Sequence, residues 1–287
     1  MKLTQEAVDR FRRDGFLFPI RVMSETQAAA LRGKLEAFER AQGHPLSGDQ
    51  RHKTHLLFAW LSDLIREEGI LDPVESLYGP NLLCWATNFF VKEARTPDFV
   101  SWHQDSTYWG LSSPDVVTAW IALTHSNASN GAMEVIPGTH LMDQVPHRDT
   151  YAKHNLLTRG QEVMVDVDPA KAVRLDLEAG EMSLHHVRLI HGSPPNPSDD
   201  RRIGIAVRLI PTSVRQIHGE DSATLVRGVD EIRSFEPEPR PRADLEPDLV
   251  AFHKRVAERN ARILYKGTQI GSYNDEAALP GVRASVG

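Results

Sequence analysis

A series of short segments between residues 81 and 210, rich in aromatic and β-branched side chains, most constrains what this chain can fold into. Turn-forming Gly, Pro, Asn and Asp residues separate these segments, as expected for β-strands joined by turns. Apolar residues follow helical spacing before residue 80 and again near the C-terminus. The chain is expected to begin with helices, continue with many short strands and end with one helix. This order predicts an α+β protein that is mainly β. We expect an antiparallel sandwich or barrel with helices packed outside it.

Start and stop signals locate the expected helices. Thr4 precedes an amphipathic run that Gly15 ends, and Ser24 with Gln27 resembles a capping box for a helix to about Gln42. Apolar spacing predicts further helices over residues 56–65, 72–77 and 249–265. The predicted strands cover residues 16–20, 81–91, 102–108, 116–123, 132–137, 162–167, 173–177 and 203–210.

The polar stretch 142–159 has no periodicity and is long for an ordinary connection. We therefore predict that it is a functional loop or lid. No internal repeat or linker divides the chain, so we predict a single domain over residues 1–287.

Composition excludes several classes of protein. The net charge of −6 argues against a nucleic-acid surface, which needs a basic patch. Cys84 is the only cysteine, so no disulfide forms within the chain, which suits a reducing compartment. The first residues lack the apolar core of a signal peptide, and no apolar run approaches the length of a membrane span. We expect a cytoplasmic protein with no membrane or nucleic-acid partner.

The chemistry is expected at His103 and Asp105. In a strand, side chains two residues apart share one face, so this imidazole and this carboxylate would project together. One histidine and one carboxylate are two of the three ligands of a facial triad for ferrous iron. A second His-x-Asp pair, at residues 147–149, is rejected because the residues around it do not predict a strand.

His191 is the expected third ligand. It follows the apolar stretch 187–190, and Gly192 and Ser193 after it allow the backbone to approach closely. His185 and His186 are alternatives, but they lack a Gly-Ser pair downstream. We expect one of the two to be packed in a strand and the other to be solvated.

Arg202 lies eleven residues past His191, after a turn rich in Pro, Asn, Asp and Ser. Two strands joined by that turn would bring its guanidinium beside the metal, where it can hold the far end of a dicarboxylate. Ser193 shares the face of His191 and can add a hydroxyl to that grip. Strand alternation allows only one of Arg201 and Arg202 to point inward.

Several ordered motifs resemble the phytanoyl-CoA dioxygenase family of Fe(II)- and 2-oxoglutarate-dependent oxygenases. They are residues 11–17, the His103-Gln104-Asp105 motif, residues 118–120 with 130–131, residues 136–140, and His191-Gly192-Ser193 followed by residues 196–198 and Arg202. The family fold is a double-stranded β-helix, a jelly-roll barrel similar to cupins, which agrees with the strand pattern and implies flanking N-terminal and C-terminal helices.

The resemblance also implies roles for individual residues. His103, Asp105 and His191 match the iron ligands, Arg202 and Ser193 match the residues that hold the 5-carboxylate of 2-oxoglutarate, and Gln104 and Trp120 resemble cosubstrate-pocket residues. The implied reaction consumes O2, releases succinate and CO2, and hydroxylates an aliphatic C–H bond. Asp105 stands where family halogenases have a small residue, which favours hydroxylation.

The sequence indicates the identity of the substrate less clearly than that of the metal ligands. Asn88, Phe90, Tyr108 and Trp109, with the 142–159 stretch, are the residues expected to face it. A compact polar metabolite is favoured over an acyl-CoA because no basic patch clusters for a nucleotide. The basic residues that a charged substrate would need are each expected to be solvated: His52, His55, Arg188, Arg208 and Arg215. The alternatives are a non-catalytic metal and 2-oxoglutarate sensor, and a β-sandwich carbohydrate-binding module with exposed aromatic residues.

Overall fold

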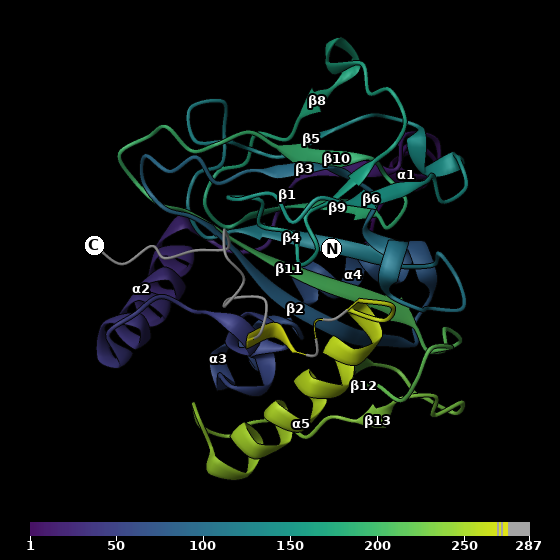
Figure 1. Cartoon of the computed structure of the whole chain (residues 1–287). Helices are drawn as coiled ribbons and strands as arrows, with labels where there is room; N and C mark the ends of the chain where they lie inside the picture. The colour runs from purple at the N-terminus through teal and green to yellow at the C-terminus, as the bar shows by residue number, and fades with distance from the viewer. Residues whose placement is uncertain (269, 271, 275–287) are drawn as a thin grey trace.

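The computed structural model describes residues 1–268, 270 and 272–274, and its centre is a pair of packed β-sheets (Figure 1). The major sheet has the strand order β1 (Phe16–Arg21), β9 (Glu181–His186), β4 (Val117–Ala122), β11 (Arg202–Pro211), β2 (Leu82–Lys92), β12 (Ser222–Arg227) and β13 (Glu236–Pro237). The second sheet has the order β3 (Val100–His103), β10 (His191–Ser193), β5 (Glu134–Val135) and β8 (Val173–Arg174). The predicted class, α+β and mainly β, is confirmed.

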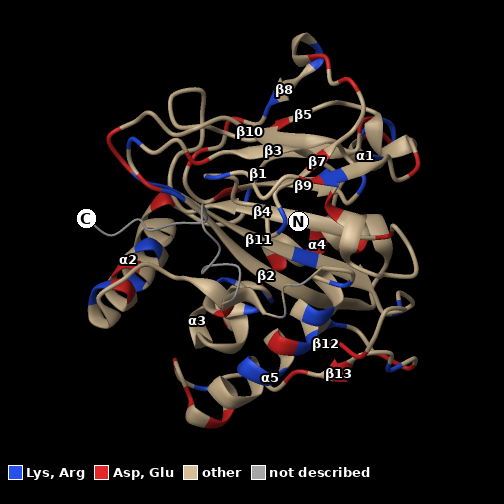
Figure 2. Ribbon diagram, in the orientation of Figure 1, with Lys and Arg blue, Asp and Glu red and all other residues tan. Residues whose placement is uncertain are grey.

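Helices cover the outside of the major sheet. They are α1 (Gln5–Asp14), α2 (Glu25–Gln42), α3 (Ala59–Leu64), α4 (Glu68–Tyr78) and α5 (Pro247–Leu264). The N-terminal four share one apolar cluster with the sheet, and α5 lies beside β12 and β13 (Figure 1). The Thr4 cap and the Ser24–Gln27 capping box both form as predicted. Acidic and basic side chains are interspersed along α2 and α5 (Figure 2). Among the described residues, no helix has the length and apolar character that a membrane crossing requires.

Alternation along the central strands separates a packing face from a site face. Odd-numbered residues of β4 and β11, such as Val117 and Ile205, pack beneath the helices in the largest apolar cluster. Even-numbered residues, such as Trp120 and Ala206, pack with Val135 and the second sheet. Successive strand residues point to opposite faces, so the same strands build both the core and the space between the sheets.

Three sequence expectations are corrected. The strand predicted over 102–108 ends at His103, and a 3-10 helix, η3 (Asp105–Tyr108), replaces its second half. The stretch 142–159 is not wholly irregular, because β6 (His147–Asp149) pairs with β7 (Gln161–Val163). The strand β12 was not expected, because the sequence around it shows no clear alternation of apolar and polar residues. It forms by antiparallel pairing with β2.

A buried charged cluster joins the segment after η1 (Gly48–Arg51) to the C-terminal strands. The Lys53 ammonium donates to a Glu238 carboxylate oxygen at 3.0 Å and to the carbonyls of Trp85 and Ser222. The other Glu238 oxygen lies 2.7 Å from His55 Nε2. Burial opposes both charges, but the neighbouring carboxylates raise the pKa of Lys53, and Lys53 and His55 hold the pKa of Glu238 well below its ordinary value.

Replacing Glu238 with glutamine should lower the free energy of unfolding by about 3 kcal/mol, because it leaves the buried Lys53 charge with only the more distant Asp221 carboxylate, 3.6 Å away. Since the pKa of Glu238 is depressed in the folded chain, its carboxylate stabilises the fold above the ordinary carboxyl pKa, and that contribution is lost as the pH falls. The variant should therefore lose less stability than the wild type below about pH 5. Urea unfolding at several pH values measures both effects.

Glu220→Gln is the matched control, because the Glu220 side chain is 90% exposed. It should change the free energy of unfolding by less than about 0.5 kcal/mol. Equal stability of Glu238→Gln and the wild type at neutral pH would refute the account of the cluster.

Candidate metal centre and adjoining cavities

Two histidines face each other across paired strands. His191 on β10 is the register partner of His103 on β3, and their ring centroids lie 4.1 Å apart. Adjacent antiparallel strands hold opposite side chains close together even when they are far apart in sequence. Gly192 permits the close approach, since a Cβ there would lie 3.0 Å from the Val100 carbonyl oxygen. Strand pairing therefore brings together two of the three predicted ligands.

Asp105 reaches the same point by a turn and not by strand alternation. It begins η3, and its backbone N–H donates to the Val187 carbonyl at 2.9 Å. One carboxylate oxygen lies 3.5 Å from His103 Nε2, and the other accepts from the Thr118 hydroxyl at 3.3 Å. The expectation that Asp105 and His103 share the face of one strand was wrong, although the two side chains do meet.

The three side chains form a donor set that suits ferrous iron. One ligand atom from each of His103, Asp105 and His191 lies within 4.8 Å of the others, and all three residues are buried. Each histidine Nδ1 bonds to a backbone carbonyl, that of Ser101 at 2.9 Å or that of Leu189 at 2.8 Å. Those bonds leave Nε2 of each ring directed at the cluster, as metal-binding histidines require.

The protonation states also suit a metal. Burial lowers the pKa of His191 well below its ordinary value, so the ring is neutral. Burial opposes ionisation of Asp105, but the adjacent His103 and His185 rings and the charge of Arg208 hold its pKa well below its usual range. Metal ligands must be neutral imidazoles and ionised carboxylates, and His191 and Asp105 meet this requirement.

His185, which the sequence offered as an alternative third ligand, is buried beside this cluster. Its Nε2 lies 3.7 Å from an Asp105 oxygen, its ring centroid is 4.7 Å from that of His191, and it is 2% exposed. His186 is half-buried, with its ring centroid 5.3 Å from that of His140, and is not fully solvated as expected. The position of His185 depends on its strand register opposite Thr118, and this register cannot be read from the sequence alone.

The rejected His-x-Asp pair does lie on a strand, β6, so the reason given for its rejection was wrong. His147 Nε2 accepts from the Gln104 backbone N–H at 3.0 Å, and Asp149 accepts from Tyr108 and Arg159. These contacts tie the β6–β7 hairpin to the segment that carries Asp105. The pair is not part of the cluster of potential metal ligands found among the described residues.

A small cavity leads from the cluster to a buried guanidinium. Its lining includes Trp120, Ser193 and Arg202. Arg202 is 2% exposed; it donates to the Gly131 carbonyl at 2.7 Å and lies 5.1 Å from the centre of the Trp120 ring. Its Nε has no hydrogen-bond partner among the described residues. Burial lowers the pKa of Arg202 to about 10, so it remains charged at neutral pH.

Lys92 is a second basic residue at this end, and no sequence pattern indicated it. Its Nζ donates to the Ser193 hydroxyl at 2.6 Å and to the Gly131 carbonyl at 3.1 Å. Burial and the Arg202 charge lower the pKa of Lys92 to about 6. No described carboxylate forms an ion pair with Lys92 or Arg202. The Ser193 oxygen accepts from Lys92, which leaves the hydroxyl proton free to be donated.

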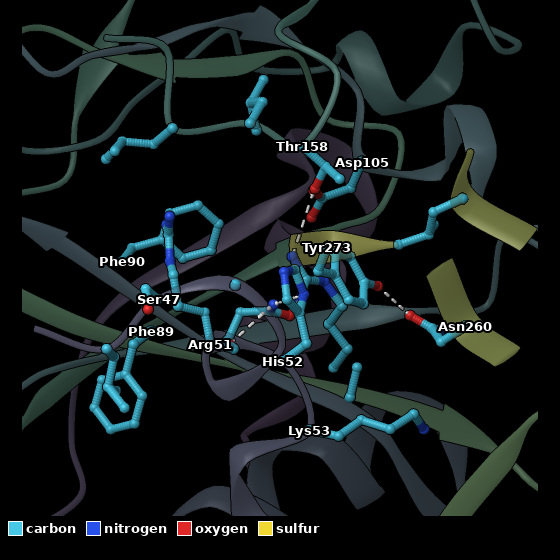
Figure 3. A pocket seen from close by; sticks show the side chains of 18 of the residues that line it. Ser47, Arg51, His52, Lys53, Phe89, Phe90, Asp105, Thr158, Asn260 and Tyr273 are labelled. Atoms are coloured by element: carbon cyan, nitrogen blue, oxygen red, sulfur yellow. Dashed lines mark hydrogen bonds and ion pairs between the residues drawn. The ribbon is translucent and has the colours of Figure 1, made fainter. Parts of the chain in front are cut away.

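A second cavity, of about 410 Å³, opens on the other side of Asp105. Its size is within the usual range for small-molecule sites. Figure 3 shows Asp105 on one wall, Phe89 and Phe90 on another, and His52 with Tyr273 between them. The rings of His52 and Tyr273 stack with centroids 3.6 Å apart. Phe90, Asp105 and Arg208 line both cavities, so the two spaces meet at the metal cluster.

Some of the other residues predicted to bind substrate or cosubstrate line the large cavity, and others make structural contacts outside both cavities. Asn88, Phe90 and Trp109 line the large cavity. Tyr108 does not; its hydroxyl bonds to Asp149 at 2.5 Å beneath the Arg159 guanidinium. Gln104 is fully buried outside both cavities, where its side chain donates to the Arg188 carbonyl and accepts from the Val145 N–H. A structural role in holding the loop before β6 accounts for Gln104.

Comparison with known proteins agrees with this geometry. A family model described as phytanoyl-CoA dioxygenase matches residues 11–204. A probable alpha-ketoglutarate-dependent hypophosphite dioxygenase from Stutzerimonas stutzeri is 31% identical over 169 residues, which cover 58% of this chain and 58% of that protein. The L-proline trans-4-hydroxylase of Streptomyces griseoviridis is 26% identical over 221 residues, covering 69% of this chain and 82% of the hydroxylase.

The fold has close counterparts among solved structures. The apo form of the non-heme monooxygenase ThoJ superposes with a TM-score of 0.81 at 33% identity, covering 95% of this chain and 99% of ThoJ. Its nickel complex superposes with a TM-score of 0.76, covering 90% of this chain and 98% of ThoJ. The predicted jelly roll is confirmed by these neighbours.

Removing one ligand should abolish tight metal binding. His103→Ala should weaken binding of Fe(II) or Co(II) by more than about 100-fold, since loss of even an outer partner of a ligand costs 10–100-fold. His125→Ala is the matched control, because its side chain is 54% exposed and lines neither cavity. Anaerobic calorimetric titration measures both affinities. Unchanged metal affinity in His103→Ala would remove the residue from the site.

Proposed function

The chain belongs to the phytanoyl-CoA dioxygenase family, and from this premise we propose that it is an Fe(II)- and 2-oxoglutarate-dependent dioxygenase that hydroxylates an aliphatic C–H bond of a small molecule. One observation carries the proposal. A buried His, Asp and His cluster separates a cavity that ends at Arg202 from a larger cavity with apolar walls. Such an oxygenase needs a metal between a cosubstrate site and a substrate site.

His103, Asp105 and His191 would hold the iron. Two imidazoles and one carboxylate are the protein ligands of ferrous oxygenases that leave coordination positions open. When bound, the iron supplies the oxidation by O2 in which 2-oxoglutarate is converted to succinate and CO2 and the substrate gains a hydroxyl. The contribution of the chain is to position the two organic molecules and to exclude water.

Arg202 and Ser193 would hold the distal carboxylate of 2-oxoglutarate. The guanidinium is buried, charged and without a carboxylate partner in the described part of the chain, which is costly unless an anion binds there. Lys92 positions the Ser193 hydroxyl so that its proton can be donated to that anion. Trp120 forms a flat wall beside Arg202 and limits the cavity to a narrow molecule.

The substrate would occupy the large cavity. Asn88, Phe90 and Trp109 line it, together with Leu156 and Leu157 from the segment predicted to be a lid. These apolar walls shield the reacting C–H bond from bulk water. The carboxylate of Asp105 fills the position that would need to be vacant for a halide, which favours hydroxylation.

Three alternative functions make different predictions. A non-catalytic sensor would bind metal and 2-oxoglutarate at the same residues but would not turn over. An acyl-CoA hydroxylase would need a site for the nucleotide as well as the acyl chain. A carbohydrate-binding module needs exposed aromatic rings, whereas Trp60, Trp85, Trp109 and Trp120 are buried.

Neighbouring arginines offer a matched test of the cosubstrate site. Arg202→Met should weaken binding of 2-oxoglutarate to the metal-loaded protein by about 30-fold or more, since truncating a buried charge pair costs about 2–5 kcal/mol. Arg201→Met should leave that affinity unchanged, because Arg201 points outward and pairs with Glu39 and Glu93. Anaerobic calorimetry with Co(II) gives both dissociation constants. Equal losses in the two variants would contradict the assignment.

Turnover separates the enzyme from the sensor. Wild-type protein with Fe(II), O2 and 2-oxoglutarate should release succinate faster when pools of small metabolites are added. His103→Ala should give no stimulated release. Mass spectrometry should find one product 16 mass units heavier than its substrate, as expected for one added oxygen atom. Tight binding of metal and 2-oxoglutarate without stimulated succinate release from any pool would favour the sensor.

A further inference from the structure

Arg208 carries a charge that the proposed reaction does not use. It lies on β11, six residues after Arg202 and therefore on the same face of the strand. It is 7% exposed and lines both cavities, whereas Arg202 lines only the small one. The sequence expectation that Arg208 is solvated is therefore wrong. Its guanidinium lies 4.6 Å from the centre of the Trp109 ring.

The protein neutralises this buried charge poorly. One guanidinium nitrogen donates to the neutral Asn88 side chain, and Nε has no hydrogen-bond partner among the described residues. The nearest carboxylate is that of Asp105, at 3.9 Å, which is longer than a hydrogen bond. Asp105 is also a proposed iron ligand, so the metal would share its negative charge. A buried cation in this situation favours an anionic ligand.

The rest of the large cavity adds a second guanidinium, that of Arg51, and apolar surface. Lys53 also lines it, but Glu238 and Asp221 balance its charge. Asp105 is the only carboxylate among the described lining residues. Beside polar residues such as Asn155 and Thr158, aromatic and aliphatic side chains form a large part of its wall: Trp85, Phe89, Phe90, Leu156, Leu157 and Leu264. A ligand that fits has a negative group at one end and an apolar body.

We propose that Arg208 is the substrate-binding residue that selects small organic acids, with the acid group held by the guanidinium and the apolar body along the walls of the large cavity. This inference rests on the proposed function only for the hydroxylation of the bound acid. Binding itself needs only the cavity and the Arg208 charge, and both are present without metal. The acid group is a carboxylate or a phosphonate, since both accept paired hydrogen bonds from a guanidinium.

Matched probes test the charge requirement. The probes are 3-phenylpropionate, its neutral amide 3-phenylpropanamide, and 2-phenylethylphosphonate. Each is titrated calorimetrically into metal-free protein and into protein loaded anaerobically with Fe(II) and 2-oxoglutarate. We expect at least one of the two acids to bind about tenfold or more tightly than the amide, since a hydrogen bond to a charged group is worth that much. Comparison of the carboxylate with the phosphonate identifies the preferred acid group.

Three variants assign the preference to the guanidinium. Arg208→Gln should reduce acid affinity at least about tenfold and leave amide affinity unchanged. Arg208→Lys keeps the charge and should retain part of the preference, which guards against loss of folding in the glutamine variant. Arg215→Gln is the control, because Arg215 is exposed and lines neither cavity.

The outcomes decide the matter in either direction. Acid preference that disappears in Arg208→Gln supports the proposal, and acid binding by metal-free protein would support it even if turnover fails. Equal affinity for acids and amide, or no binding of any acid probe, would overturn it. A large loss of 2-oxoglutarate affinity in Arg208→Gln with unchanged acid binding would instead assign the guanidinium to the cosubstrate.

Discussion

The antiparallel pairing of β3 with β10 is the constraint on which the rest of the structure depends. It sets His103 opposite His191 in the register, so two imidazoles from distant parts of the sequence meet inside the barrel. Asp105 joins them because the chain leaves the strand in a tight turn immediately after His103. A one-residue shift in that register would move one ring to the opposite face and dissolve the cluster.

β11 organises the space on the other side of the cluster. Its even-numbered residues point inward, and they place a guanidinium at each end, Arg202 and Arg208, with small residues between them. Gly204 is one of these because a Cβ there would lie 1.9 Å from the Trp120 ring. One strand thus provides the arginine proposed to hold the cosubstrate, clearance for the Trp120 ring and the arginine proposed to bind the substrate.

The sequence predicted what depends on local pattern or on recognisable motifs. The helix caps and the strands β4 and β11 follow from short-range signals. The His103, Asp105 and His191 set follows from ordered motifs, although the strand geometry expected for Asp105 was wrong. Features that depend on tertiary pairing were missed: Lys92 behind Ser193 and the burial of Arg208. Burial of a charged side chain is decided by which strands pack over it, and no spacing along the chain records that.

A crystal structure of the protein, grown without oxygen and with Fe(II) and 2-oxoglutarate, would show both ligands in place. We expect an anomalous iron peak bound by Nε2 of both histidines and by one Asp105 oxygen, with the distal carboxylate of 2-oxoglutarate against Arg202. Iron bound at other side chains, or 2-oxoglutarate held away from Arg202, would contradict this expectation.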